Sequence, residues 1–571
     1  MSRMGKCLEL LVLVLPLFLL FLLQPNAPAA TDMALHLRLS NDYSLVLASM
    51  TGMPDWDPLV CEGRGALTFR FVGQLPLLAA AFFQLIGCET ATALKLAVLS
   101  FAIAGSAGMS RWLGGLGLSW PRRLAGGLVF FSGPALALHL FHNFFFQNLC
   151  AVLLFPCVLA GISSGWVSAA IGIGLMGWTH LQMTFVCTCL LGGIALIQRV
   201  TMHSWKPVLR TVAAAVVGGM LAAPFWLPAV LTIPSVHVEA KSAVRPGIES
   251  LFLDDVFQQG REGEIGRISG LMPLLDAIKS GGGHIHGEDG SVLFRFLRPW
   301  MLLLTLLFLL AAILGAILVR RHGAFPAGVM GFLAAAAMFR FSMPLWQAIP
   351  VFAGILEFSW RLLLPMQILL TPLIADGGME GARAAGKSLR GFASPLIIAM
   401  VFGAPLAISA VFTAVSIPLT REKIALYINE ASTVAPMFLP VHAPLTASQS
   451  PMAGVPFALS IRRGAGRIEP GDIDLTSKRF TADISSGGAE IGIATHYDQD
   501  WRLSDAYGEV AITPDSRDGT MIVELSEGRH ELHLERRFPR GRIPGWILMI
   551  GGMVVILLRK SPSVSQDEKG V

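Results

Sequence analysis

Acidic and imidazole side chains near the start of the chain are the first candidates for chemistry. Asp32 and His36 stand directly after an apolar run over residues 8–23. A carboxylate at the mouth of a helix bundle can act as a general base on an acceptor hydroxyl. Thr31 or Asp32 can equally be the N-cap of a helix over residues 33–39. The sequence leaves both roles open for Asp32.

Asp55 and Asp57 form a D-x-D pattern around Trp56 in the same segment. Two carboxylates at this spacing can hold a divalent cation through oxygen ligands. The flanking Pro54 and Pro58 favour a polar turn instead. A divalent cation at this pair and a turn that binds no metal are the two alternatives.

Other polar side chains stand at the ends of apolar runs, where they can line a site or hydrogen-bond between helices. They are His139, His142, Asn143, Gln147 and Asn148 in one group, and His180 and Gln182 in the next.

Glu357 and Arg361 are spaced i, i+4 and can form a salt bridge along one helix face. Arg361 can also bind a lipid-linked phosphate through charge-assisted hydrogen bonds, and Arg340 can assist it. The spacing alone does not choose between a structural pair and a phosphate-binding site.

The composition determines which kind of scaffold positions these residues. The chain has 571 residues, of which 54% are hydrophobic and 14% charged, and its mean hydropathy is +0.63. Soluble domains carry roughly a quarter charged residues, so a soluble enzyme is excluded. The Lys and Arg residues cluster in short loops and form no continuous basic face, so nucleic acid is not expected as a partner. The sequence predicts a multi-pass α-helical membrane protein.

The apolar runs predict about twelve spans. They cover residues 8–23, 96–109, 124–141, 146–161, 165–179, 181–197, 209–231, 300–319, 325–339, 362–375, 393–415 and 545–558. With both termini inside, the basic short loops satisfy the positive-inside rule. The apolar segment 71–87 then lies along the interface instead of spanning. We expect a bacterial inner-membrane protein whose site faces the periplasm or exterior.

Three domains are predicted from this pattern. Residues 1–415 form a transmembrane domain with outer loops 25–92 and 232–299, residues 416–544 form an extracytoplasmic β-rich domain, and residues 545–571 form the last helix and a short cytoplasmic tail. Short runs with period-two alternation and the turn signals Asp518-Gly519 and Glu527-Gly528 predict a β-sandwich in the second domain.

An ordered set of motifs extends over nearly the whole chain. It comprises Asp32 with His36, Gly52-x-Pro54-x-Trp56, Gly63-x-Gly65, Gln74-Leu75-Pro76-Leu77, Trp178-Thr179-His180-Leu181-Gln182, Pro224-Phe225-Trp226-Leu227-Pro228, Phe341-Ser342-Met343-Pro344-Leu345-Trp346, Phe358-Ser359-Trp360-Arg361, and His496-Tyr497-x-x-x-Trp501. The set resembles bacterial membrane proteins of the 6-pyruvoyl-tetrahydropterin synthase-related and YfhO-type group. These proteins belong with the GT-C superfamily of membrane glycosyltransferases.

The resemblance implies a GT-C-like fold with an acceptor-activating Asp directly after the first span, a position that Asp32 matches. It implies that a polyprenyl-phosphate sugar is the donor and that the sugar is transferred with inversion to an envelope glycan, lipid or protein. It also implies that Arg361 or Arg340 is the cation beside the leaving lipid phosphate. The expected substrate-binding residues are His36, Asp55, Asp57, His139, His142, Asn143, His180, Gln182, Arg340, Glu357 and Arg361.

One departure from the family pattern keeps a second function open. Many GT-C enzymes carry another acidic residue in the next outer loop, where this chain has Asn143, Gln147 and Asn148. Neutral amides bind sugar hydroxyls but cannot serve as a base. The alternative is a non-catalytic scaffold that binds glycan or lipid, and a transporter or flippase ranks third because the spans carry few mid-span charges.

Overall fold

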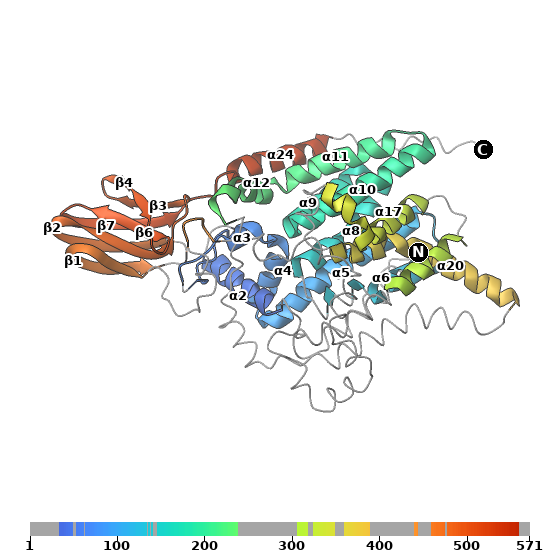
Figure 1. The fold of residues 1–571 in the computed structure, drawn as a ribbon, viewed down its shortest axis with the longest axis horizontal. Helices are drawn as coiled ribbons and strands as arrows, with labels where there is room; N and C mark the ends of the chain where they lie inside the picture. Colours follow the sequence, from blue (N-terminus) through green and yellow to red (C-terminus); the bar gives the residue numbers. More distant parts are fainter. Residues whose placement is uncertain are drawn as a thin grey trace, which may run out of the picture.

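The computed structural model contains a helical domain and a C-terminal β-sheet at one end of the molecule (Figure 1). It describes residues 33–49, 53–61, 63–133, 135–136, 139–140, 146–237, 305–317, 324–348, 359–388, 439–443, 458–473, 475 and 477–558.

The first described elements of the helical domain lie on the side of the sheet (Figure 1). They are α2 (Met33–Ser49), α3 (Thr68–Phe71) and α4 (Gln74–Leu85). The chain between α3 and α4 packs closely on the end of α9. Gly73 lies so near the backbone oxygen of Thr179 that a Cβ at this position would clash with it. The predicted interfacial segment 71–87 is therefore mostly the helix α4, seated against the bundle.

Closely packed helices form the centre of this domain. They are α5 (Thr90–Gly115), α6 (Trp120–Ser132), α8 (Phe146–Ser164), α9 (Trp166–Thr179), α10 (Leu181–Met202) and α11 (Lys206–Leu221). α5 runs parallel to α8, and α9 runs parallel to α11. Among the described residues, α5, α8 and α10 are long and apolar enough to cross a membrane. Large apolar side chains such as Leu196, Val200 and Val216 stay exposed on their outer faces, as expected of a protein embedded in lipid.

The predicted span 209–231 consists of two helices joined at a bend. The chain bends by 73° between α11 and α12 (Ala223–Thr232). Pro224 lies in the first turn of α12, and its ring and missing N–H cannot continue the preceding helix. α12 consequently turns toward the sheet (Figure 1).

The remaining described helices complete the bundle. They are residues Thr305–Ile317, α17 (Phe325–Ala336), η6 (Arg340–Ser342), α18 (Met343–Ala348), η7 (Ser359–Leu362), α20 (Leu363–Ser388) and α24 (Arg542–Leu558). The predicted spans 8–23 and 393–415 lie outside the described residues, so twelve spans stays a prediction.

The C-terminal domain is one hydrogen-bonded sheet instead of the two separate sheets of a sandwich. Its strands are β1 (Leu459–Ile473), β2 (Ser477–His496), β3 (Trp501–Asp505), β4 (Gly508–Val510), β5 (Ile512–Pro514), β6 (Thr520–Leu525) and β7 (Gly528–Arg536). They follow the order β4-β3-β7-β2-β6-β5, and β1 pairs with β2.

The length of β2 explains this difference. Its first half pairs with β7 and its second half with β6, and Gly487 and Gly488 between the halves have positive φ. Glycine tolerates this backbone, so the strand can bend there and the sheet can curl around one core. The predicted turns at Gly519 and Gly528 are confirmed, since both glycines have positive φ.

The core of the sheet includes residues from far earlier in the chain. Trp56 and Leu67 from the α2–α3 loop and Val236 from beyond α12 pack with Trp501 and Ile491 of the sheet. The domain thus extends beyond the predicted segment 416–544.

Candidate functional site

Three helices begin at one end of the helical domain, and this end is the first candidate site. α8 and α10 are connected to the intervening α9 through Gly165 and His180, so both begin at the same end. The Arg361 Nη1 atom donates a hydrogen bond to the Gln182 Oε1 atom at 2.8 Å, which brings the start of α20 to the same end. The unpaired backbone N–H groups and dipoles of helix starts favour an anion.

Two buried histidines belong to this end. The His36 Nε2 atom accepts a hydrogen bond from the Phe146 backbone N–H at 3.3 Å, which joins α2 to the start of α8. Burial lowers the pKa of His36 to about 3, so the ring is neutral and able to accept. His139 is fully buried and lies within the electrostatic influence of Arg361.

Two amides in the first turn of α8 have unused hydrogen-bonding capacity. Gln147 and Asn148 are 6% and 3% exposed. Within the described part of the chain, the Gln147 Nε2 atom and both amide atoms of Asn148 have no hydrogen-bond partner. Because an unsatisfied buried polar group costs about 1–3 kcal/mol, these amides are suited to a polar ligand.

His180 has a structural role that its sequence position did not reveal. Its Nδ1 atom accepts from the Met183 backbone N–H at 3.2 Å and caps α10. Asp32, His142, Asn143 and Glu357 lie outside the described residues, as does the side chain of Arg340.

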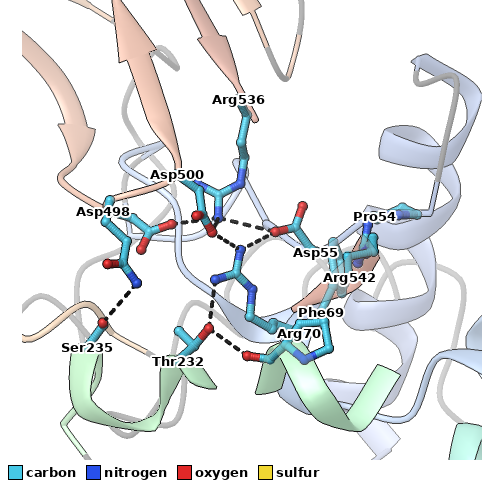
Figure 2. Close-up of polar contacts among 12 residues, drawn as sticks. Pro54, Asp55, Phe69, Arg70, Thr232, Ser235, Asp498, Asp500, Arg536 and Arg542 are labelled. Atoms are coloured by element: carbon cyan, nitrogen blue, oxygen red, sulfur yellow. Dashed lines mark hydrogen bonds and ion pairs between the residues drawn. The ribbon is translucent and has the colours of Figure 1, made fainter. Parts of the chain in front are cut away.

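Asp55 lies in a second polar centre, between the helical domain and the sheet (Figure 2). We call Asp55, Arg70, Asp498, Asp500 and Arg536 the interdomain ion cluster. The Asp55 Oδ2 atom pairs with the guanidinium of Arg70 and lies 3.2 Å from the Arg536 Nη2 atom. Arg536 also reaches Asp498 at 2.7 Å, and Arg70 reaches Asp500 at 2.7 Å.

The cluster joins four parts of the fold. Asp55 comes from the α2–α3 loop, Arg70 from α3, Arg536 from the end of β7, and the two other carboxylates from the β2–β3 turn. The Arg70 Nη1 atom also donates to the Thr232 Oγ1 atom at 3.0 Å, at the end of α12 (Figure 2).

The guanidinium groups of the cluster determine the charge state of Asp55. Burial by itself raises the pKa of Asp55, but the positive charges of Arg536 and Arg70 outweigh burial and hold the pKa below its usual range. Asp55 is therefore an ionised carboxylate already occupied by guanidinium groups.

Asp57 has a different environment from Asp55. Its Oδ1 atom accepts from the Leu59 backbone N–H at 3.2 Å. Burial and the carboxylate of Asp42 raise the pKa of Asp57 well above its usual range. A divalent cation shared by Asp55 and Asp57 does not fit this arrangement, and the polar turn does. Among the described residues, no group of three or more His, Cys, Asp or Glu side chains is arranged to hold a metal.

The sequence predictions missed four members of the interdomain ion cluster. Arg70, Asp498, Asp500 and Arg536 were not predicted as site residues, although Asp498-x-Asp500 repeats the spacing of Asp55-x-Asp57. The repeated acidic pattern was the available signal. Its partners are distant in sequence, and no local pattern indicates them.

Comparison with known proteins identifies structural neighbours only. No protein-family model and no curated protein matches the chain. The neighbours are glycosyltransferases at low identity. The arabinofuranosyltransferase AftD from Mycobacteria has a TM-score of 0.46 and 16% identity, over 80% of this chain and 32% of AftD.

Two further neighbours hold lipid phosphates. The oligosaccharyltransferase AglB from Archaeoglobus fulgidus, in complex with an inhibitory peptide and a dolichol-phosphate, has a TM-score of 0.37 and 14% identity, over 73% of this chain and 57% of AglB. ArnT from Cupriavidus metallidurans, bound to undecaprenyl phosphate, has a TM-score of 0.30 and 11% identity, over 72% of this chain and 88% of ArnT. This chain thus spans about a third of AftD and over half of AglB.

Proposed function

We propose that this protein is a membrane glycosyltransferase. It transfers a sugar from a polyprenyl-phosphate-linked donor to an envelope acceptor at the outer face of a bacterial inner membrane. The observation that carries the proposal is the hydrogen bond from Arg361 to Gln182, because it holds a guanidinium where three helices begin. A phosphate in this position meets one full positive charge and three favourable helix dipoles.

The donor sugar binds beside the phosphate in this proposal. Gln147 and Asn148 supply unused donors and an acceptor, which match the hydroxyl groups of a sugar. His36, which is neutral, and His139, which is buried, lie at the border of the same region. Neither adds a charge beside the phosphate site. The proposed ligand belongs to the class of the polyprenyl phosphates held by AglB and ArnT.

Asp32 is the proposed general base. It directly precedes α2, whose first turns carry His36 to the start of α8. The Asp32 carboxylate takes the proton of the acceptor hydroxyl, and the hydroxyl oxygen forms a bond to the anomeric carbon. The bond from that carbon to the phosphate oxygen breaks with inversion, and the electron pair leaves on the lipid phosphate beside Arg361.

A transfer assay tests the proposal. Wild type, Asp32→Asn and Asp505→Asn are purified into nanodiscs and incubated with radiolabelled polyprenyl-phosphate sugars and envelope extract. Asp505→Asn is a matched control, because its carboxylate caps the β3–β4 turn far from the helix starts. Thermal melting checks that all three proteins are equally folded.

The expected result is label transfer by wild type and by Asp505→Asn, and a loss of about 10²–10⁴-fold in Asp32→Asn. Transfer at the wild-type rate by Asp32→Asn would reject Asp32 as the base. Lipid binding by all three proteins without transfer from any donor would support the non-catalytic scaffold instead.

A further inference from the structure

The loop over residues 53–59 lies between the sheet and α2, and its side chains engage both. Asp55 pairs with Arg536 of the sheet, and Trp56 lies within the core of the sheet. Three residues after Trp56, the backbone oxygen of Leu59 accepts a hydrogen bond from Arg38 of α2. A segment of five residues thus connects the two bodies.

The contacts on the sheet side are buried and fix the loop in several directions. The guanidinium of Arg536 lies 4.5 Å from the centre of the Trp56 ring and 5.3 Å from that of Trp501. The two indoles meet edge to face, with their centres 5.7 Å apart. The Arg536 side chain is only 2% exposed. Arg536 therefore holds Asp55 by charge and Trp56 by its ring.

The contacts on the α2 side are equally buried. The Arg38 Nη2 atom donates to the Leu59 oxygen at 3.1 Å, and its Nε atom pairs with Asp42 at 3.1 Å. Asp57, between the two anchor points, is fully buried beside Arg38 and Asp42. A shift of the loop would break the Arg38–Leu59 hydrogen bond inside the protein, which costs free energy.

We propose that Arg536 is a positioning residue through which the C-terminal sheet fixes the orientation of α2. Arg536 holds Asp55 and Trp56, the loop carries this constraint to Leu59, and Leu59 holds Arg38. The relevance to catalysis rests on the proposed function, because α2 begins one residue after Asp32. The sheet in this account is part of the transferase machinery.

Hydrogen exchange on the full-length protein in nanodiscs tests the connection directly. Arg536→Met removes the charge and keeps an apolar side chain. Arg537→Met is the matched control, because the neighbouring Arg537 side chain is 48% exposed and, among the described residues, forms its ion pair with Glu509 at the sheet edge. Asp55→Asn removes the same ion pair from the loop side, together with the ion pair to Arg70, and Arg536→Lys keeps the charge.

The expected result is faster exchange of the α2 amides, by about tenfold or more, in Arg536→Met and Asp55→Asn. Exchange in α8, which Arg536 does not touch, stays at the wild-type rate, and Arg537→Met resembles wild type throughout. Arg536→Lys restores part of the protection. If Arg536→Met does not fold, Asp55→Asn and Arg536→Lys provide the same comparison.

Two outcomes would overturn the proposal. Faster exchange confined to β3 and β7 would show that the constraint ends within the sheet. Equal acceleration in α2 and α8 would show a general loss of stability with no specific connection.

Kinetics separate positioning from simple stabilisation. In the transfer assay, Arg536→Met should lower kcat about tenfold or more at an unchanged KM for the lipid donor, because the base is misplaced while Arg361 still binds phosphate. A higher KM at unchanged kcat contradicts the positioning role. If wild type transfers no sugar, the proposed function fails, while the exchange pattern still decides whether Arg536 orients α2.

Discussion

Arg536 lies against two indole rings at the centre of the interdomain ion cluster. Its Nη2 atom pairs with the carboxylates of Asp55 and Asp498. Its Nε and Nη1 atoms have no hydrogen-bond partner among the described residues. The rings of Trp56 and Trp501 account for this, because an aromatic face attracts a guanidinium group. At the residue scale, the buried charges of this centre are thus matched by opposite charges or by π faces.

Sequence patterns identified some residues of the candidate site but not their partners. Gln182 and Arg361 were both predicted, yet only the fold joins them, across 179 positions. Asp55 was also predicted, while its partner Arg536 lies 481 positions later. Residue type and local spacing reveal that a polar group needs a partner in an apolar chain. They contain no information on which distant residue supplies it.

His496 provides a prediction at this scale. Burial lowers its pKa to about 4, and its Nδ1 atom lies 2.8 Å from the Gly65 oxygen, which joins β2 to the α2–α3 loop. The unfolded chain binds a proton near pH 6.5. Stability is therefore fully present above about pH 6.5 and is lost as the pH falls toward 4, by on the order of 1–3 kcal/mol.

Thermal melting between pH 7 and pH 4 measures this loss. His496→Gln keeps an N–H donor but does not titrate, so its stability should depend less steeply on pH than that of wild type. His533→Gln on β7, where the ring is partly exposed, is the control. Identical pH profiles for wild type and His496→Gln would show that His496 does not cause the dependence.

At the element scale, the ends of helices explain where the predicted span differs from the structure and why a polar side chain is buried among the helices. The bend between α11 and α12 follows from Pro224, which the sequence prediction included within one span. α6 ends at Ser132, and the side chain of Gln367 of α20 forms hydrogen bonds with backbone groups before and after this end. It donates to the Phe130 oxygen at 2.7 Å and accepts from the Ala135 N–H at 3.0 Å. Such backbone groups require a partner inside a membrane.

Gln367→Met tests this role, because methionine has a similar volume and no hydrogen bonds. The loss of two hydrogen bonds to buried backbone groups should lower the free energy of unfolding by about 2–4 kcal/mol. Gln198→Met on α10, where the side chain is half-buried, is the control and should change it little. Thermal or denaturant unfolding in detergent compares them, and equal stability of both variants would contradict the role.

Strand prediction succeeded for short segments and failed where strands are long. The predicted strands near 491–495 and 521–525 were confirmed in β2 and β6. β2 extends over twenty residues because its first half pairs with β7 and its second half pairs with β6. Alternation in sequence indicates that a strand exists. It does not indicate that one strand bends and pairs with different neighbours along its two halves.

At the scale of the whole molecule, the C-terminal domain and the helical domain share a core. Trp56, Leu67 and Val236 belong to the hydrophobic core of the sheet although they lie outside segment 416–544. The composition of that segment does not indicate that residues from elsewhere in the chain complete its core. A domain's core need not come from one stretch of chain, and here residues outside 416–544 contribute to it.

An excised sheet tests this shared core. Residues 458–541 alone should be poorly packed, with little near-UV circular dichroism and no cooperative thermal transition. The same fragment fused through a flexible linker to residues 53–71 should regain both, because Trp56 and Leu67 return to the core. Cooperative melting of the unfused fragment at the temperature of the fusion would contradict the shared core.

The central claim is that the end at which α8, α10 and α20 begin binds a polyprenyl phosphate. Equilibrium binding of undecaprenyl phosphate to wild type, Arg361→Gln and Arg199→Gln in nanodiscs tests it most directly. Arg199 lies in the last turn of α10, at the opposite end of the same helix, where it stacks on Trp205. We expect a loss of affinity of on the order of ten- to a hundredfold in Arg361→Gln and wild-type affinity in Arg199→Gln. Equal affinity in all three proteins, or the larger loss in Arg199→Gln, would contradict it.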